Sequence, residues 1–243
     1  MIWLNFVGEG RSGHTVLSGA IGSRMDTLIT EEQKFISKWR RGFSREGIFQ
    51  EVQHAGAGRT RKAQGWPNLT EYTNLRVIGD KAGWDAVNEF TKRDAPASII
   101  SDFSAFMGGM PVKTLVTVRH PLDNITAWVD SPKYKRVFSD DHLRFRRMIR
   151  RYKRFYTAAA IILQNTDYRI VVHEELCRNP NDTLQRLSEW LELPSDRDWR
   201  RDASSRIHNS PHRRRDDVQW PEGYYEERLV PFIQENPLMA AYR

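Results

Sequence analysis

The sequence predicts a single α/β domain, in which helices flank a central and mostly parallel β-sheet. Short apolar segments alternate along the chain with segments of helical periodicity, which is typical of parallel sheets covered by helices. A glycine-rich turn follows the first apolar segment and leads into a helix, as in folds that bind phosphate groups. The chain has 243 residues, which suffices for one such domain with a sizeable core. We therefore expect residues 1–243 to form one domain.

The first third of the chain predicts two strands, a helix and an insertion. Residues 2–7 form a β-branched and aromatic run that predicts a buried strand, and residues 15–24 predict the helix that follows it. Residues 40–74 are rich in Gly, Arg, Gln and Asn and have weak periodicity. We expect them to form a long, partly irregular insertion that could act as a substrate flap. Residues 75–79 predict a short strand.

The rest of the chain continues the alternation of strands and helices. The clearest helix is predicted where apolar residues from Phe145 to Leu163 recur at helical spacing, opposite a face rich in arginine. The expected elements after residue 80, in chain order, are a helix at 85–92, a strand at 98–101, a strand at 113–118, a helix at 140–165, a strand at 168–173 and a helix at 181–191.

The composition favours anionic partners and a reducing compartment. There are 38 Lys and Arg against 31 Asp and Glu, a formal net charge of +7, which favours nucleotides, sulfated or phosphorylated compounds, nucleic acid or an anionic membrane surface. No run of 18 apolar residues predicts a transmembrane span, and the first residues lack the pattern of a signal peptide. The only cysteine, Cys177, excludes an intramolecular disulfide. We expect a cytoplasmic protein.

The loop after the first strand reads Gly-Glu-Gly-Arg-Ser-Gly-His-Thr at residues 8–15. Gly8 and Gly13 have the spacing of the phosphate-binding pattern G-x-x-x-x-G-K-[ST], but His14 stands where that pattern has lysine. The only basic side chain within the loop is Arg11, three residues earlier. Backbone N–H groups of such a turn, together with the positive end of the following helix, form a seat for an anion.

Three interpretations of this loop are open from the residues alone. A nucleotide or small-molecule kinase needs a lysine on the phosphates and an acidic residue near Mg²⁺, and Ser101-Asp102 after an apolar run could supply that acid. A turn without any ligand is the second interpretation. The third is a loop that binds an anion through arginine rather than lysine.

The third interpretation agrees with a family resemblance. The segment Arg11-Ser12-Gly13-His14-Thr15 resembles the 5′-phosphosulfate loop, P-[KR]-S-G-T-T, of sulfotransferases that use 3′-phosphoadenosine 5′-phosphosulfate (PAPS) and release adenosine 3′,5′-bisphosphate (PAP). Glu9-Gly10 replaces the usual proline context, and His14 replaces the first threonine. The resemblance implies that PAPS is the co-substrate and that no metal is needed. It implies a donor seat made by the loop residues Gly8, Gly10, Arg11, Ser12, Gly13, His14 and Thr15.

A second segment, Val118-Arg119-His120-Pro121-Leu122-Asp123, resembles the 3′-phosphate motif R-[DN]-P-x-[DE] of the same family. The resemblance implies that Arg119 contacts the 3′-phosphate, and an arginine at the end of a strand is suited to that role. The family places a serine eight residues after this arginine, where this chain has Ala127. Either Thr126 supplies the hydroxyl or the contact is missing. A strand exit with a surface ion pair is the alternative.

The resemblance also implies catalytic residues. In the tyrosylprotein and glycan branches, to which the pattern is closest together with the bacterial-type branch, a glutamate about twenty residues after the loop arginine acts as the base. That spacing gives Glu31 or Glu32, and we favour Glu32; a solvated helix start is the alternative. Asp80-Lys81-Ala82-Gly83 is similar to the E-K-T-P segment of the glycan branch. Lys81 could meet the transferring sulfuryl group, or lie in a strand-exit turn.

Residues 171–194 resemble a late segment whose role in the family is mainly structural. We expect 195–243 to cover the nucleotide or the substrate, with Ser210 and Arg213 near the donor. The acceptor is expected to be a hydroxyl or amine on a small molecule, glycan or peptide, which could be anionic. The departures at His14, Ala127 and Ala82-Gly83 leave room for a homologue that binds the nucleotide without transferring sulfate.

The arginine-rich face between Arg144 and Arg154 has three interpretations. A solvated helix face is the ordinary one, guidance of an anionic acceptor is the second, and contact with nucleic acid is the third. The arginines are not interleaved with exposed aromatic residues, so we do not expect nucleic acid as the partner. A non-enzymatic nucleic-acid-binding protein is nevertheless the third functional class to be tested.

Overall fold

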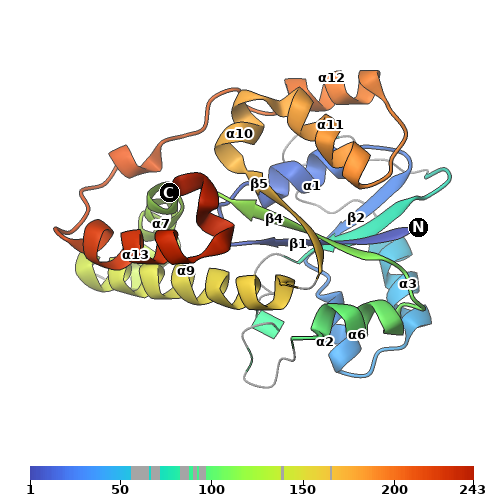
Figure 1. Cartoon of the computed structure of the whole chain (residues 1–243), viewed down its shortest axis with the longest axis horizontal. Coiled ribbons are helices and arrows are strands. Elements are labelled where there is room, and N and C mark those ends of the chain that lie inside the picture. The colour runs from blue at the N-terminus through green and yellow to red at the C-terminus, as the bar shows by residue number, and fades with distance from the viewer. Residues whose placement is uncertain are drawn as a thin grey trace.

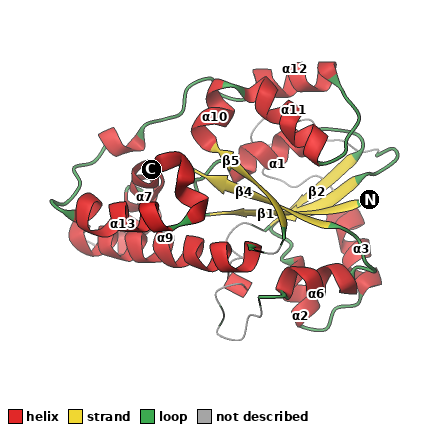
Figure 2. Cartoon of the chain, in the orientation of Figure 1, coloured by secondary structure: helices red, strands yellow, loops and turns green. Residues whose placement is uncertain are grey.

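A five-stranded parallel sheet forms the centre of the molecule (Figures 1 and 2). The computed structural model describes residues 1–55, 66, 72–82, 88–89, 92, 97–137, 140–164 and 166–243. The strand order is β2-β3-β1-β4-β5, and every neighbouring pair is parallel. The strands are β1 (Ile2–Gly8), β2 (Thr27–Glu31), β3 (Val77–Lys81), β4 (Val112–Val118) and β5 (Asp167–Val172).

The strand order reverses direction between β1 and β4. The chain leaves β1 to build β2 and β3 on one side, and then crosses to build β4 and β5 on the other. The carboxyl ends of β1 and β4 are adjacent, because Gly8 pairs with Thr117 in the register. In open parallel sheets, ligands bind outside the carboxyl ends of the strands at such a reversal. This edge is therefore where the fold itself predicts a site.

Helices cover both faces of the sheet (Figure 1). One face carries α1 (His14–Gly22), α10 (His173–Arg178), α11 (Pro180–Trp190) and α12 (Arg197–Ser205). The other carries α2 (Phe35–Arg40), α3 (Arg45–Ala55), α6 (Ile99–Phe106), α7 (Pro121–Val129), α8 (Pro132–Val137), α9 (Asp141–Leu163) and α13 (Val230–Glu235). Short turns of other helix types lie at Arg214–Asp216, Tyr224–Leu229 and Pro237–Tyr242. None of the helices within the described residues has the length and apolarity to cross a membrane.

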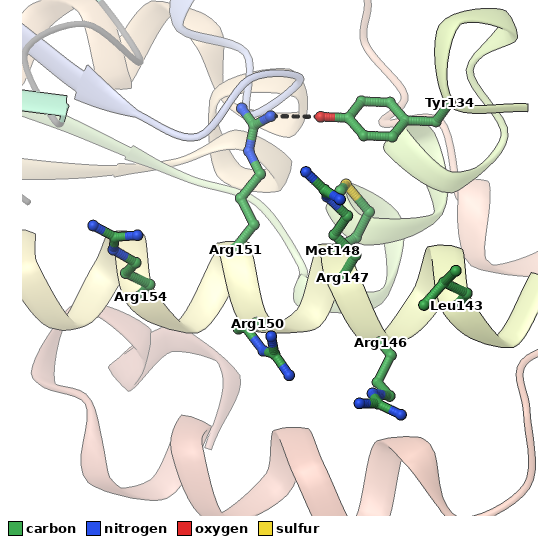
Figure 3. A pocket seen from close by; sticks show the side chains of 8 residues that line it. All are labelled: Tyr134, Leu143, Arg146, Arg147, Met148, Arg150, Arg151 and Arg154. Carbon is green, nitrogen blue, oxygen red and sulfur yellow. Dashed lines mark hydrogen bonds between the residues drawn. The ribbon is translucent and has the colours of Figure 1, made fainter. Parts of the chain in front are cut away.

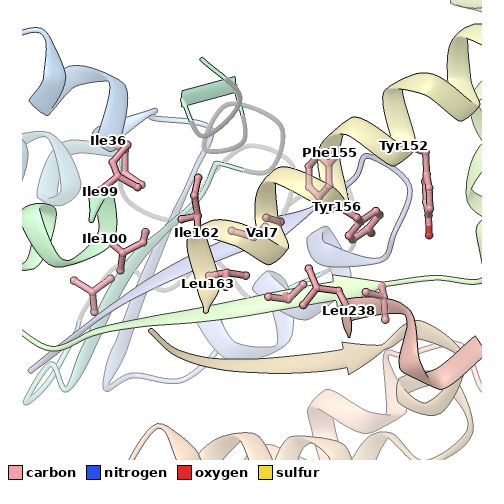
Figure 4. Close-up of a cluster of buried hydrophobic side chains, with 14 of the residues drawn as sticks. Val7, Ile36, Ile99, Ile100, Tyr152, Phe155, Tyr156, Ile162, Leu163 and Leu238 are labelled. Atoms are coloured by element: carbon pink, nitrogen blue, oxygen red, sulfur yellow. The ribbon is translucent and has the colours of Figure 1, made fainter. Parts of the chain in front are cut away.

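Two hydrophobic clusters, one on each face, hold the layers together. Alternate residues of β1 serve the two faces, as the period of a strand requires: Trp3 and Val7 belong to one cluster, and Leu4 and Phe6 to the other. The larger cluster packs the apolar stripe of α9 against the sheet, and Figure 4 shows Val7 beside that helix. Burial of this stripe on a 23-residue helix explains why the element was predictable from periodicity alone.

Most predicted elements are present within a few residues of their expected bounds. The strands expected at 2–7, 75–79, 113–118 and 168–173 correspond to β1, β3, β4 and β5. The helices expected at 15–24, 140–165 and 181–191 correspond to α1, α9 and α11. The helix expected at 85–92 lies mostly outside the described residues.

Three expectations need correction. The apolar run at 98–101 is the start of helix α6 and not a strand, because Ile99, Ile100 and Phe103 are buried on one helical face. The first part of the supposed irregular insertion at 40–74 is helix α3, whose buried face holds Ile48 and Val52. Strand β2 was missed altogether, because its five residues include two threonines and only two apolar side chains.

Candidate active site

The loop between β1 and α1 is shaped to bring backbone N–H groups to one point. Gly13 adopts φ 94° as the N-cap of α1, and no side chain caps that helix, so its first N–H groups are not taken up by a cap. A Cβ on Gly13 would lie 2.4 Å from Nδ1 of His173, and a Cβ on Gly8 would lie 2.1 Å from Oγ1 of Thr117. Both positions require glycine because neighbouring side chains approach the backbone.

Side chains of helices α7 and α9 hold the loop in place through hydrogen bonds and an ion pair. The carbonyl of Gly10 accepts hydrogen bonds from Trp128 Nε1 at 2.9 Å and Asn124 Nδ2 at 3.2 Å. The buried carboxylate of Glu9 accepts from Gly10 N at 3.2 Å and pairs with Arg151 at 2.7 Å. Burial raises the pKa of Glu9, and Arg151 opposes that shift. Glu9, which stands where the family has its proline context, is thus a structural anchor of the loop.

Arg11 and Arg119 meet at this loop. Arg11 has φ 72° and an exposed side chain, and its guanidinium lies 5.8 Å from the centre of the Trp128 ring. Arg119 follows β4 and is 7% exposed; its Nη1 donates to the carbonyl of Arg11 at 3.1 Å and its Nη2 donates to the carbonyl of His212. Arg119 Nε is buried and has no hydrogen-bond partner. The two predicted phosphate ligands therefore lie at the same loop.

The position that the phosphate-loop pattern gives to lysine is occupied here by a neutral imidazole. His14 is buried, and desolvation, reinforced by the charge of Lys81, lowers its pKa to about 4. Ser12 Oγ hydrogen-bonds Thr117 Oγ1 at 2.7 Å and contacts His14 Nδ1 at 3.3 Å, which joins the loop to β4. His14 therefore brings no positive charge to the loop at neutral pH.

Lys81, at the end of β3, brings a cation to the same place from another strand. Its side chain is 3% exposed, and its Nζ lies 3.5 Å from Thr15 Oγ1 and 3.5 Å from Glu32 Oε1. The side chain of Glu32 is 66% exposed, whereas Glu31 is a buried residue at the end of β2. Of the two candidate bases, Glu32 is the exposed one, and its carboxylate contacts Lys81.

Asp80 builds the turn that carries Glu32. Its carboxylate accepts hydrogen bonds from Gln33 N at 3.2 Å, Lys34 N at 2.9 Å and Thr30 Oγ1 at 2.9 Å. Glu32 and Lys34 both have positive φ, 57° and 61°, a conformation that costs free energy outside glycine and needs such support. Burial raises the pKa of Asp80 to about 6 despite these bonds. The sequence motif pointed to Lys81 in this segment but did not predict that Asp80 supports the turn.

The C-terminal segment crosses α7 close to Arg119. Arg215 binds Asp123 through its backbone N at 2.8 Å and through Nε and Nη2 at 3.1 and 2.9 Å. Trp220 Nε1 donates to Thr126 Oγ1 at 2.9 Å, so this fully buried hydroxyl already has an indole partner. The aspartate of the 3′-phosphate motif is therefore an attachment point for residues 212–220.

The remaining site candidates lie nearer the surface. Ala127 is half-buried on α7, one residue from Thr126. Ser210 is exposed, and Arg213 is exposed and pairs with Asp216 at 3.3 Å. Neither side chain has a recorded contact with Arg119, although His212 between them does. Gly83, the last residue of the segment similar to E-K-T-P, lies outside the described residues.

The acidic residue that the kinase interpretation names does not lie at the loop. Asp102, its candidate, is exposed on helix α6 and accepts from Ser98 Oγ at 2.8 Å. Asp80 does lie near the end of β3, which pairs with β1, but its carboxylate accepts from Thr30 of β2 and from the turn that follows β2. Within the part of the chain that is described, no group of three or more His, Cys, Asp or Glu side chains could hold a metal ion.

Several solved structures have a fold similar to that of this chain. A sulfotransferase from Alicyclobacillus acidocaldarius matches with a TM-score of 0.55 and 12% identity, over 99% of this chain and 95% of that one. Mouse sulfotransferase SULT7A1, crystallised in complex with PAP, matches with a TM-score of 0.57 and 8% identity, over 100% of this chain and 89% of that one. The protein has the sulfotransferase fold.

A third sulfotransferase-fold neighbour is the sulfotransferase domain from the curacin biosynthetic pathway. It matches with a TM-score of 0.52 and 14% identity, over 81% of this chain and 75% of that domain. No protein-family model matches the chain, and no curated protein matches its sequence. At these identities the comparisons establish the sulfotransferase fold, and the chemistry must be argued from the residues of this chain.

Proposed function

We propose that the protein transfers a sulfuryl group from PAPS to a hydroxyl group of an acceptor, with Glu32 as the base. The observation that carries this proposal is the position of Lys81. Its ammonium group lies 3.5 Å from the hydroxyl of Thr15, at the start of α1, and 3.5 Å from the carboxylate of Glu32. A buried cation between an anion seat and an exposed carboxylate suits a reaction in which charge moves from acceptor to donor.

The residues around the loop fit the donor. The uncapped N-terminus of α1 and the exposed guanidinium of Arg11 suit the phosphosulfate end. Arg119 has a buried Nε with no partner, and a phosphate is the kind of acceptor that a guanidinium edge takes. Mouse SULT7A1, which was crystallised with PAP, supports a nucleotide ligand with phosphates at its 3′ and 5′ positions. We place the 3′-phosphate at Arg119 and the phosphosulfate at the loop.

In this proposal the reaction is a single in-line displacement. The acceptor oxygen forms a bond to sulfur while the bond between sulfur and the bridging phosphate oxygen breaks, and the electron pair of that bond leaves with PAP. Glu32 takes the proton of the acceptor hydroxyl. Lys81 and Arg11 stabilise the negative charge that develops on the bridging oxygen and the sulfuryl group. His14 is neutral at pH 7 and supplies no charge for this stabilisation.

The test is a transfer assay with PAPS as the donor and a panel of phenolic, neutral-sugar and acidic-sugar acceptors. Conversion of PAPS to PAP should depend on the acceptor, proceed with EDTA present, and fall by about 10²- to 10⁴-fold in Glu32→Gln. Glu31→Gln is the matched control, because Glu31 is buried whereas the side chain of Glu32 is 66% exposed, and it should keep most of the rate. Equal losses in both variants, or turnover of ATP that requires Mg²⁺, would contradict the assignment.

A further inference from the structure

The exposed face of α9 forms an arginine-lined hollow. The hollow has a volume of about 540 Å³ (Figure 3). In Figure 3, Arg147, Arg151 and Arg154 extend on the side of Tyr134, and Arg146 and Arg150 extend on the other side of the helix. The guanidinium groups thus form two neighbouring stripes along one helix. The charged and aromatic residues that line the hollow are Tyr134, Arg146, Arg147, Arg150, Arg151 and Arg154.

A second basic hollow, of about 530 Å³, adjoins the first. Arg154 lines both, so the two hollows adjoin at this residue, and we call the pair the basic groove. At its far end the second hollow is lined by Lys34, two residues after Glu32. The basic groove therefore starts beside the candidate base. The charged residues that line the second hollow are Lys34, Arg41, Glu89, Lys92 and Arg154.

The charge of the basic groove is strongly one-sided. Of the described residues, eight basic side chains line it against one acidic side chain, Glu89, which pairs with Arg40 and Lys92. Arg146 and Arg150 are exposed and have no carboxylate partner among the described residues. Like charges four residues apart on a helix are destabilising. An arrangement that repels itself in the free protein is suited to a ligand that supplies the missing negative charge.

The interpretation of this face as simply solvated is incomplete, because two of its arginines are structural. Arg144 is buried and pairs with Asp141. Arg151 holds Glu9 of the anion loop, donates to Tyr134 Oη at 2.8 Å, and lies 4.5 Å from the Trp128 ring centre. Arg11 lies over the same ring at 5.8 Å. The basic groove and the donor loop are thus connected through one indole.

We propose that the acceptor is an acidic carbohydrate chain, bound along the basic groove through several carboxylate or sulfate groups. This inference rests on the sulfuryl transfer proposed above, because a carbohydrate supplies the hydroxyl that Glu32 deprotonates. Guanidinium groups bind carboxylate and sulfate with two parallel hydrogen bonds, which favours arginine over lysine in such a groove. Among the described residues, Tyr134 is the only aromatic one that lines either hollow, and it offers little of the stacking that single-stranded nucleic acid needs.

The test is a binding titration that does not depend on turnover. Dextran sulfate is the anionic probe, and unsulfated dextran of the same length is its neutral match. The double variant Arg150→Ser/Arg154→Ser removes two charges from the basic groove. The control, Arg186→Ser/Arg201→Ser, removes two charges from α11 and α12, on the opposite face of the sheet (Figure 1). We expect binding of dextran sulfate but not dextran, about tenfold weaker in the groove variant and nearly unchanged in the control.

Failure of this proposal can be distinguished from failure of the proposed function. Thermal stabilisation by PAP is measured in the same variants and should be the same in all of them, because neither pair of arginines lies at the donor loop. Equal loss of dextran sulfate binding in the groove and control variants would overturn the groove assignment while leaving PAP binding intact. Tighter binding of a poly-glutamate peptide or of a single-stranded oligonucleotide than of dextran sulfate would overturn the carbohydrate assignment.

Discussion

Asp80 provides the prediction that can be worked most fully from the structure. The carboxyl is buried, and its pKa rises from 3.8 to about 6 because desolvation outweighs the three hydrogen bonds that it accepts. A carboxyl that holds its proton more tightly in the folded state stabilises the fold at low pH. That stabilisation is complete below the unfolded pKa, near 4, and is lost as the pH rises through about 6.

The size of the effect follows from the shift. About two pKa units at 1.36 kcal/mol per unit give about 3 kcal/mol over the whole titration, of which about 2 kcal/mol falls between pH 4.5 and pH 8. Asp80→Asn removes the titration. The free energy of unfolding of the wild type minus that of Asp80→Asn should therefore fall by about 2 kcal/mol from pH 4.5 to pH 8.

The assay is urea unfolding followed by tryptophan fluorescence at four or five pH values, since the chain has eight tryptophans. Asp198→Asn is the matched control for the loss of one carboxylate, because the side chain of Asp198 is 86% exposed. The test is the pH dependence of the difference in unfolding free energy between wild type and Asp80→Asn. The size of that difference at any one pH is not the test, because the substitution also alters hydrogen bonds to the turn. A difference curve for Asp80→Asn that stays flat, or rises with pH, would refute the reasoning.

The other predictions concern the proposed catalytic centre. Lys81→Met should lower kcat by about 10²- to 10³-fold with little change in PAP affinity, because it removes the proposed cation between the donor and the base. An equal fall in PAP affinity would show that Lys81 binds the donor and does not act in the reaction step. Gly13→Ala should weaken PAP binding measured by thermal shift, because its Cβ would lie 2.4 Å from Nδ1 of His173 in a residue with φ 94°. Gly42→Ala, also at positive φ but with no atom within 4 Å of its Cβ, is the control for backbone strain alone, and equal PAP binding in both glycine variants would argue against the close approach.

The sequence was sufficient to predict the fold class because periodicity and loop chemistry agreed. Strand β1, the turn after it and the long stripe of α9 each carry a strong local signal. The failures have physical causes. An apolar run as short as Ile99-Ile100 does not distinguish a strand from the first turn of a helix. Strand β2 is held by tertiary bonds, such as Thr30 Oγ1 to the carbonyl of Gly79, that no local pattern reveals.

The candidate site, like the fold, was predictable from the sequence only in part. Arg11, Arg119 and Lys81 were predicted from short motifs and Glu32 from its spacing after Arg11, and the fold brings their segments to one edge of the sheet. The residues that hold these segments in place were missed. Asp80, for example, acts through backbone N–H groups of a turn more than forty residues away in the sequence, and such a partner is set by tertiary structure alone.

The most direct test of the central claim is a calorimetric titration of PAP and of 5′-AMP into the wild-type protein. The two nucleotides differ only in the 3′-phosphate, which we assign to Arg119. Charge-assisted hydrogen bonds to that group are worth about 1.5–3 kcal/mol, so PAP should bind about 10- to 100-fold more tightly than 5′-AMP. Equal affinity for the two nucleotides, or no binding of PAP, would contradict the account.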